Sequence, residues 1–128
     1  MPLNNTFTLL SYNILAEKYA STQQYGYVAS WYLSWEVRKQ MVLHEILSYD
    51  PDIVCLQEVE ANQFEQFFKP QLRMRGNYDG IFAPKSRART MNEWDRNFVD
   101  GCAIFFKMDR YGHLRLTLYL GSVWLSSI

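Results

Sequence analysis

Apolar and polar positions in the first part of the chain predict two strands separated by a helical segment. Residues 7–13 alternate loosely between apolar and polar side chains and are rich in strand formers, which predicts a strand ending at Asn13. Residues 53–56 form a continuous apolar run, as expected for a strand that is covered on both faces. A polar and aromatic loop is expected from about residue 17 to residue 34.

The segment between the two strands has the spacing of an amphipathic helix. Ser34 is a candidate N-cap, and Glu36 in the first turn suits the helix dipole. The helix is expected to stop near Tyr49, because Asp50-Pro51 cannot continue it. The positions expected on its buried face are Val37, Met41, Leu43 or His44, and Leu47.

Strand, helix and strand in this order form a βαβ unit, in which ligands gather outside the carboxyl ends of the strands. Asn13 ends the first strand and Glu58 follows the apolar run of the second. We therefore expect these two side chains at the same edge of the sheet.

The rest of the chain predicts a second helix and two further strands. Gly76-Asn77 marks the turn out of the helix, and Pro70 is expected to kink or end it. Strands are expected at 78–82 and 102–106, with a polar loop at 85–98 between them. The apolar positions of the helix are Phe64, Phe67, Phe68 and Leu72.

Composition excludes several classes of protein. Of the 128 residues, 48% are hydrophobic, which is too many for a disordered chain. Thirteen basic residues balance thirteen acidic ones, so a chain-wide cationic field is absent, although local basic patches stay open. Cys55 and Cys102 lack metal-ligand spacing and are expected to be reduced and buried. No signal peptide or membrane span is visible, which favours a soluble, cytosolic chain.

Asn13 and Glu58 each have two interpretations. A carboxylate held at a sheet rim suits Mg²⁺, which takes oxygen donors and often uses only one or two protein carboxylates. Equally, Glu58 could cap a backbone group or pair with an arginine. The Asn13 amide could orient a phosphate oxygen or a catalytic partner, or it could start a turn.

Two further groups have open alternatives. Lys85, Arg87 and Arg89 are candidate contacts to an RNA backbone, or they lie in a solvated loop of mixed charge. Trp31 and Trp35 could stack on bases or pack their loop against the core. Neither histidine has a partner at the spacing of a catalytic triad.

Short strings spread over residues 7–107 carry a family resemblance. They are Ser11–Ala16, Tyr25–Tyr27, Ser30-Trp31, Trp35-Glu36, Arg38-Lys39, Asp52–Glu60, Tyr78–Gly80, Pro84–Arg87 and Val99–Lys107. In this order they resemble the Ccr4-type deadenylases of the endonuclease/exonuclease/phosphatase (DNase I-like) superfamily. The tryptophan loop and the lysine-serine-arginine string distinguish the deadenylase branch.

The resemblance implies an α+β fold, a DNase I-like sandwich of two β-sheets flanked by helices. It also implies a Mg²⁺-dependent 3′-to-5′ exoribonuclease that shortens mRNA poly(A) tails and releases 5′-AMP. Glu58 matches the family's magnesium-ligating glutamate, and Asn13 matches its active-site asparagine. Poly(A) RNA and subunits of the CCR4–NOT complex are the expected partners, in the cytoplasm and the nucleus, while DNA and membranes are not expected.

The chain also departs from the family. The fold needs roughly twice this length, and the later Asp-x-Asn, adenine-stacking and Ser-Asp-His motifs are missing. We expect residues 1–107 to be the N-terminal part of the domain and 108–128 to be a divergent apolar tail. The chain alone is therefore expected to be inactive and marginally folded. A non-catalytic RNA-binding or protein-interaction module, or action on another phosphoester, are the competing hypotheses.

Overall fold

One mixed sheet forms the centre of the computed structural model, which describes residues 6–111. Its four strands lie in the order β1-β2-β4-β3. β1 and β2 are parallel, whereas β4 is antiparallel to both β2 and β3. The strands are β1 (Leu9–Asn13), β2 (Ile53–Glu60), β3 (Tyr78–Pro84) and β4 (Asp100–Lys107).

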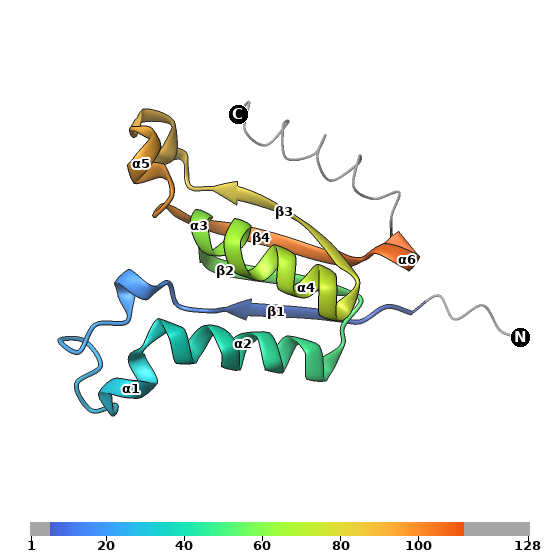
Figure 1. Ribbon diagram of the computed structural model, residues 1–128, viewed down its shortest axis with the longest axis horizontal. Coiled ribbons are helices and arrows are strands. Elements are labelled where there is room, and N and C mark those ends of the chain that lie inside the picture. Colours follow the sequence, from blue (N-terminus) through green and yellow to red (C-terminus); the bar gives the residue numbers. More distant parts are fainter. Residues whose placement is uncertain (1–5, 112–128) are drawn as a thin grey trace, which may run out of the picture.

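The longer helices lie along one face of this sheet (Figure 1), and their apolar side chains belong to the same hydrophobic core as those of the strands. Val54, Leu56 and Phe105 of the sheet are fully buried together with Ile46 and Phe68 of the helices. The helical segments are η1 (Glu17–Tyr19), α1 (Ser30–Leu33), α2 (Trp35–Tyr49), α3 (Ala61–Gln63), η2 (Phe64–Phe68), α4 (Lys69–Gly76), η3 (Ser86–Thr90), α5 (Glu93–Arg96) and α6 (Met108–Tyr111).

The βαβ unit predicted from the sequence is confirmed. β1 ends at Asn13, α2 ends at Tyr49, and Asp50 takes the left-handed conformation that terminates the helix. Ser34 occupies the N-cap position, but its side chain makes no capping hydrogen bond. β1 and β2 are aligned so that Asn13 pairs with Gln57, next to Glu58.

The buried face predicted for α2 is wrong in part. Met41 and His44 are exposed, while the buried positions are Trp35, Val42, Leu43 and Ile46. The helix is therefore rotated relative to the prediction. Trp35 packs edge-on against Phe68 at a centroid distance of 6.2 Å.

The second helix passes Pro70 without ending there. Its first part contains a π-helical turn, η2, directly before α4, and Pro70 lies in the first turn of α4. A π turn changes the hydrogen-bond spacing, so the missing N–H of proline is tolerated near that point. The helix ends at Gly76, and Asn77 takes the left-handed conformation, as the sequence predicts.

The opposite face of the sheet is less covered than predicted. Ile53 and Cys55 of β2 are only half-buried, so the expectation of a strand covered on both faces holds for one face only. Cys102 is exposed, which corrects the prediction of two buried cysteines. Both thiols are free.

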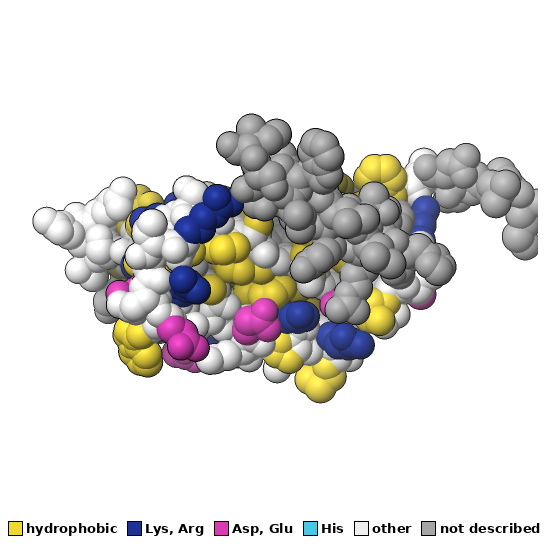
Figure 2. Space-filling view, turned by 90° about the horizontal axis from the view of Figure 1, so that it is seen from above, with side chains coloured by type: hydrophobic (Ala, Val, Ile, Leu, Met, Phe, Trp, Pro, Cys, Tyr) yellow, Lys and Arg dark blue, Asp and Glu magenta, His cyan; other side chains and the backbone are white. Residues whose placement is uncertain are grey.

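Seen from above, one side of the molecule shows acidic and basic side chains intermixed, with hydrophobic side chains between them (Figure 2).

Two predicted segments have other outcomes. The polar loop at 85–98 is organised by the short helices η3 and α5. The predicted tail at 108–128 lies mostly outside the described residues. Among the described residues, no helix is long and apolar enough to cross a membrane.

Candidate active site

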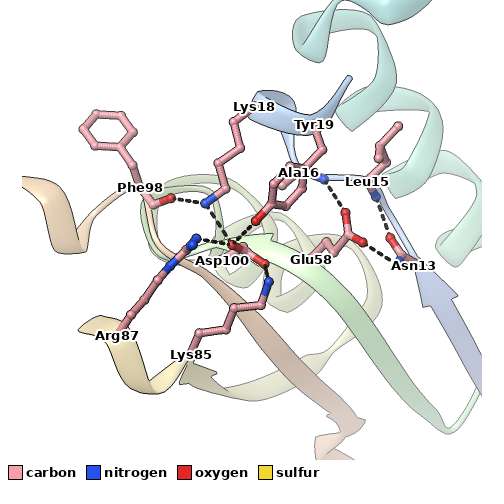
Figure 3. A network of polar contacts seen from close by, with 10 residues as sticks. All are labelled: Asn13, Leu15, Ala16, Lys18, Tyr19, Glu58, Lys85, Arg87, Phe98 and Asp100. Carbon is pink, nitrogen blue, oxygen red and sulfur yellow. Dashed lines mark hydrogen bonds and ion pairs between the residues drawn. The ribbon is translucent and has the colours of Figure 1, made fainter. Parts of the chain in front are cut away.

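Asn13 and Glu58 meet at the carboxyl ends of β1 and β2. The Asn13 Nδ2 group donates a hydrogen bond of 2.8 Å to Glu58 Oε1 (Figure 3). The pair forms because β1 and β2 are parallel neighbours, so their carboxyl ends lie at one edge of the sheet. The structure thus brings together the two site residues that the sequence predicts.

Glu58 lies at a β-bulge between β2 and β4. The register shifts between Gln57 and Val59, and Glu58 has a φ of 58°. This left-handed conformation is costly for a residue with a Cβ, and bulges of this kind redirect a side chain at the end of a strand. Here the bulge leaves Val59 fully buried and keeps the half-buried Glu58 carboxylate at the rim.

The loop after β1 supplies the second donor to Glu58. The Ala16 N–H donates to Glu58 Oε2 at 3.3 Å, and the Leu15 N–H donates to Asn13 Oδ1 at 2.9 Å. The turn interpretation of Asn13 is confirmed by the hydrogen bond to its carbonyl, and its amide group contacts Glu58, while a catalytic role for Asn13 stays a prediction. Leu15 itself has a φ of 54°, so this loop is as constrained as the bulge beside it.

Arg38 of α2 binds the same loop through hydrogen bonds to its backbone. Its Nη1 group donates to the carbonyls of Ile14 and Leu15 at 3.0 and 2.7 Å. Its guanidinium also lies 5.1 Å from the ring of Trp35. Burial lowers the pKa of Arg38, and the charge of Glu17 opposes that shift. We infer that Arg38 fixes the loop that presents the Ala16 N–H to Glu58.

A second carboxylate, Asp100 at the start of β4, lies close to this pair and has different surroundings. Its side chain is fully buried and forms ion pairs with Lys18 at 2.8 Å, Lys85 at 2.5 Å and Arg87 at 2.8 Å. The Tyr19 hydroxyl donates to the same carboxylate at 3.1 Å. We call these residues, Lys18, Tyr19, Lys85, Arg87 and Asp100, the Asp100 cluster.

The cations determine the protonation of Asp100. Burial alone would raise its pKa, but hydrogen bonds from Lys18 and Lys85 and the charge of Lys18 outweigh burial and hold the pKa well below its usual range. The hydrogen bond to Asp100 in turn raises the pKa of Lys85. Glu60 pairs with Asp100 across the strands, but its pKa is shifted in the opposite direction. Burial raises the pKa of Glu60, and the charge of Lys18 only partly opposes this shift.

The three predicted RNA contacts take different places. Lys85 and Arg87 are directed to Asp100, with their side chains half-exposed. Arg89 is exposed on η3 and makes contacts of its own. The sequence analysis did not identify Lys18 or Asp100 as site residues, since Asp100 appeared there only as part of the string Val99–Lys107.

The glycine that follows Asp100 lets β3 approach β4 closely. A Cβ on Gly101 would lie 2.1 Å from the carbonyl oxygen of Ala83 on β3. Gly101 therefore permits the close approach of β3, whose end leads directly to Lys85.

The Glu58 pair fits part of a divalent-metal site. Its donors are carboxylate and amide oxygens, which suit a hard cation, and no Lys or Arg pairs with Glu58 within residues 6–111. In that range, no group of three His, Cys, Asp or Glu side chains could hold a metal ion. Mg²⁺ commonly binds through one or two carboxylates with water and phosphate oxygens completing its shell, so a single glutamate is compatible with it.

Sequence comparison gives the family. Residues 10–122 match the model of the Endonuclease/Exonuclease/phosphatase family. The chain belongs to this family. The CCR4-Not complex 3′-5′-exoribonuclease subunit Ccr4 of Schizosaccharomyces pombe is 51% identical to this chain over 108 residues. The aligned residues cover 84% of this chain and 16% of that protein.

Other relatives in the same family are similar to this chain at about the same level of identity. CCR4-NOT transcription complex subunit 6-like-A of Xenopus laevis is 51% identical over 106 residues, which cover 83% of this chain and 19% of that protein. The Saccharomyces cerevisiae Ccr4 subunit is also 51% identical over 106 residues, 83% of this chain and 12% of the protein. This family member therefore spans less than a fifth of the length of these relatives.

Solved structures confirm the fold class of the family member. The human Nocturnin catalytic domain with bound sulfate anion superimposes with a TM-score of 0.58 at 36% identity, covering 80% of this chain and 33% of that one. ANGEL2, a 2′,3′-cyclic phosphatase, superimposes with a TM-score of 0.64 at 27% identity, covering 80% and 27%. The α+β, DNase I-like assignment is confirmed, with this chain corresponding to part of the domain.

Proposed function

We propose that this chain is the N-terminal part of a Mg²⁺-dependent 3′-to-5′ exoribonuclease that shortens poly(A) and releases 5′-AMP. The observation that carries the proposal is the contact between Asn13 and Glu58 at the carboxyl ends of two parallel strands. The 51% identity to Ccr4 subunits named as 3′-5′ exoribonucleases supports the class of reaction.

The roles of the two residues follow from their contacts. Glu58 would hold the cation through a carboxylate whose two donors, the Asn13 amide and the Ala16 N–H, are both neutral. Asn13 fixes the direction of the Glu58 carboxylate, and its position beside that group also suits a contact to the scissile phosphate. The bulge and Arg38 hold this arrangement in place before substrate arrives.

A bound Mg²⁺ ion would neutralise charge on the phosphate and help activate the attacking water. The residues of this chain supply one carboxylate for it, together with the rigid rim that positions that carboxylate. We propose that the remaining catalytic groups lie outside residues 1–128, so that this segment alone does not cleave RNA. Lys85, Arg87 and Arg89 are proposed contacts to the RNA backbone.

A hybrid enzyme tests this function. Residues 1–107 would replace the aligned segment of the Schizosaccharomyces pombe Ccr4 relative, and the hybrid would be given 5′-labelled oligoadenylate with Mg²⁺. We expect stepwise shortening from the 3′ end, release of 5′-AMP and loss of activity in EDTA. A folded hybrid that leaves oligoadenylate intact while the parent cleaves it would contradict the proposal.

The same hybrid separates the competing hypotheses. Abasic DNA, inositol phosphates and RNA ending in a 2′,3′-cyclic phosphate test other phosphoester substrates, the last because ANGEL2 is named as a 2′,3′-cyclic phosphatase. A folded hybrid that binds oligoadenylate with Mg²⁺ without cleaving it, and whose binding is unchanged by Glu58→Gln, would favour a non-catalytic module.

The proposed assembly is the CCR4–NOT complex, because several relatives are named as its subunits. The proposed location is correspondingly the cytoplasm and the nucleus. Copurification of the tagged protein with CCR4–NOT subunits, and fluorescence of the tagged protein in cells, test these two points.

A further inference from the structure

The Asp100 cluster contains more positive charge than its carboxylate needs. One buried carboxylate is paired with three cations, which leaves an excess of two positive charges. Glu60 is within the electrostatic range of Lys18 and offsets part of this excess, although its burial disfavours the ionised form. Lys85 and Arg87 therefore carry most of the uncompensated charge.

These two side chains have capacity for another anion. Each is half-exposed, whereas the carboxylate between them is fully buried. Within the described residues, Arg87 makes a single hydrogen bond, from Nη2 to Asp100, so its Nε and Nη1 groups remain available. Arg and Lys donors of this kind bind phosphate oxygens strongly.

The cluster lies on the same rim as Glu58. Asp100 pairs with Glu60, which follows Glu58 by two residues on β2, directly after the bulge. Figure 3 shows the two groups side by side, joined by the segment that carries Ala16, Lys18 and Tyr19. An RNA backbone with one phosphate at Glu58 can therefore place its neighbouring phosphate at the cluster.

We propose that Asp100 is a positioning residue that fixes Lys85 and Arg87 at the rim as a binding site for an RNA backbone phosphate, next to the phosphate that reaches Glu58. The identity of the ligand as RNA rests on the proposed function. Lysine and arginine side chains lose considerable conformational entropy when they bind a ligand. By ordering them beforehand, Asp100 reduces that cost of binding.

Asp100→Asn separates this role from a simple effect of charge. The substitution makes the rim more positive, so a pure charge effect would strengthen RNA binding. A positioning role predicts weaker binding, because Lys85 and Arg87 lose their anchor. The measurement is the affinity of the 128-residue chain for fluorescein-labelled oligoadenylate by anisotropy in EDTA, where no cleavage occurs.

The salt dependence counts the phosphate contacts. Lys85→Gln and Arg87→Gln should each lower the salt slope by about 0.7 and the affinity about fourfold near 0.15 M salt. Arg73→Gln, the same change on an exposed residue of α4, is the matched control and should leave the slope unchanged. Asp100→Asn should weaken binding by up to about fourfold, the effect of losing one phosphate contact, because its substitution releases Lys85 and Arg87. Tighter binding of Asp100→Asn would overturn the inference.

A double-mutant cycle tests whether Asp100 acts through Lys85. In the Asp100→Asn background, Lys85→Gln should change the affinity much less than in the wild type. If Lys85→Gln keeps its full effect there, the positioning role is wrong. Because binding is measured without cleavage, loss of catalysis in the hybrid enzyme would contradict the proposed function and leave this result unaffected.

A measurement on the wild type covers the case in which Asp100→Asn does not fold. The Arg87 side-chain Nη signals in NMR should be resolved, since the guanidinium is held, and inorganic phosphate should shift them. The signals of Arg73 should be averaged and unaffected. Averaged Arg87 signals that do not respond to phosphate would overturn the inference.

Discussion

Two carboxylates at one rim of the sheet, Glu58 and Asp100, are held in contrasting ways. Glu58 is half-buried and accepts hydrogen bonds from two neutral groups. Asp100 is fully buried and is paired with three cations. The first keeps its negative charge available for a cation from solution, whereas the second uses its charge to organise Lys18, Lys85 and Arg87.

The backbone conformations of Glu58 and Asp100 also differ. Glu58 has a left-handed φ at a bulge, a conformation that costs about 1–2 kcal/mol for a residue with a Cβ. Asp100 lies in regular strand geometry at the start of β4, paired with Glu60. Strain that persists at Glu58 and is absent at Asp100 is consistent with a functional role for the first and a structural or positioning role for the second.

The largest effect is expected at Glu58. Glu58→Gln keeps the shape of the side chain but removes its charge, so RNA cleavage by the hybrid enzyme should fall about 100- to 1000-fold, as for the loss of one catalytic electrostatic group. The unfolding transition of the 128-residue chain should stay unchanged. Full cleavage activity in Glu58→Gln would assign the cation to another group.

Asp100 should instead control stability. Asp100→Ala leaves Lys18, Lys85 and Arg87 facing one another without their shared counter-ion, and the free energy of unfolding should fall by about 3 kcal/mol. Urea denaturation of the 128-residue chain measures this loss. Glu60→Gln is the matched control, and it should be neutral or slightly stabilising, because burial of Glu60 disfavours its charged form. An equal loss in both variants would show that the ion pairs are not its cause.

Acid should weaken the Asp100 cluster. Because the pKa of Asp100 is depressed in the folded chain, its contribution to stability is complete above the unfolded value of about 3.9 and is lost as the pH falls through the folded value. Glu60 has a raised pKa, so its contribution has the opposite sign. The free energy of unfolding should therefore decline below about pH 4, and this decline should be smaller in Asp100→Asn. Identical acid profiles would contradict the assignment.

The smallest effect concerns backbone strain. Glu58→Gly relieves the left-handed φ and should stabilise the chain by about 0.5–1 kcal/mol, although it removes the proposed metal ligand. Gln57→Gly, at the neighbouring strand position before the bulge, should destabilise by a similar amount. Thermal unfolding of both variants checks this. If Glu58→Gly is the less stable of the two, the bulge is not strained.

The sequence predicted the pair of Asn13 and Glu58 because parallel strands in a βαβ unit end at the same edge. The bulge was not predictable, since glutamate gives no marker for a left-handed φ. The Asp100 cluster was missed because its cations come from η1 and from the segment after β3, far from Asp100 in sequence. The rotation of α2 escaped prediction because Met41 and His44 fit a helical stripe that packing assigned to Val42 and Ile46 instead.

Binding of a divalent cation at Glu58 tests the contrast between the two carboxylates most directly. The 128-residue chain, labelled with ¹⁵N, would be titrated with Mn²⁺, whose paramagnetism broadens nearby amide signals even when binding is weak. Our account predicts broadening at Leu15, Ala16 and Glu58, and its loss in Glu58→Gln. Broadening that persists in Glu58→Gln, or that centres on Asp100, would contradict it.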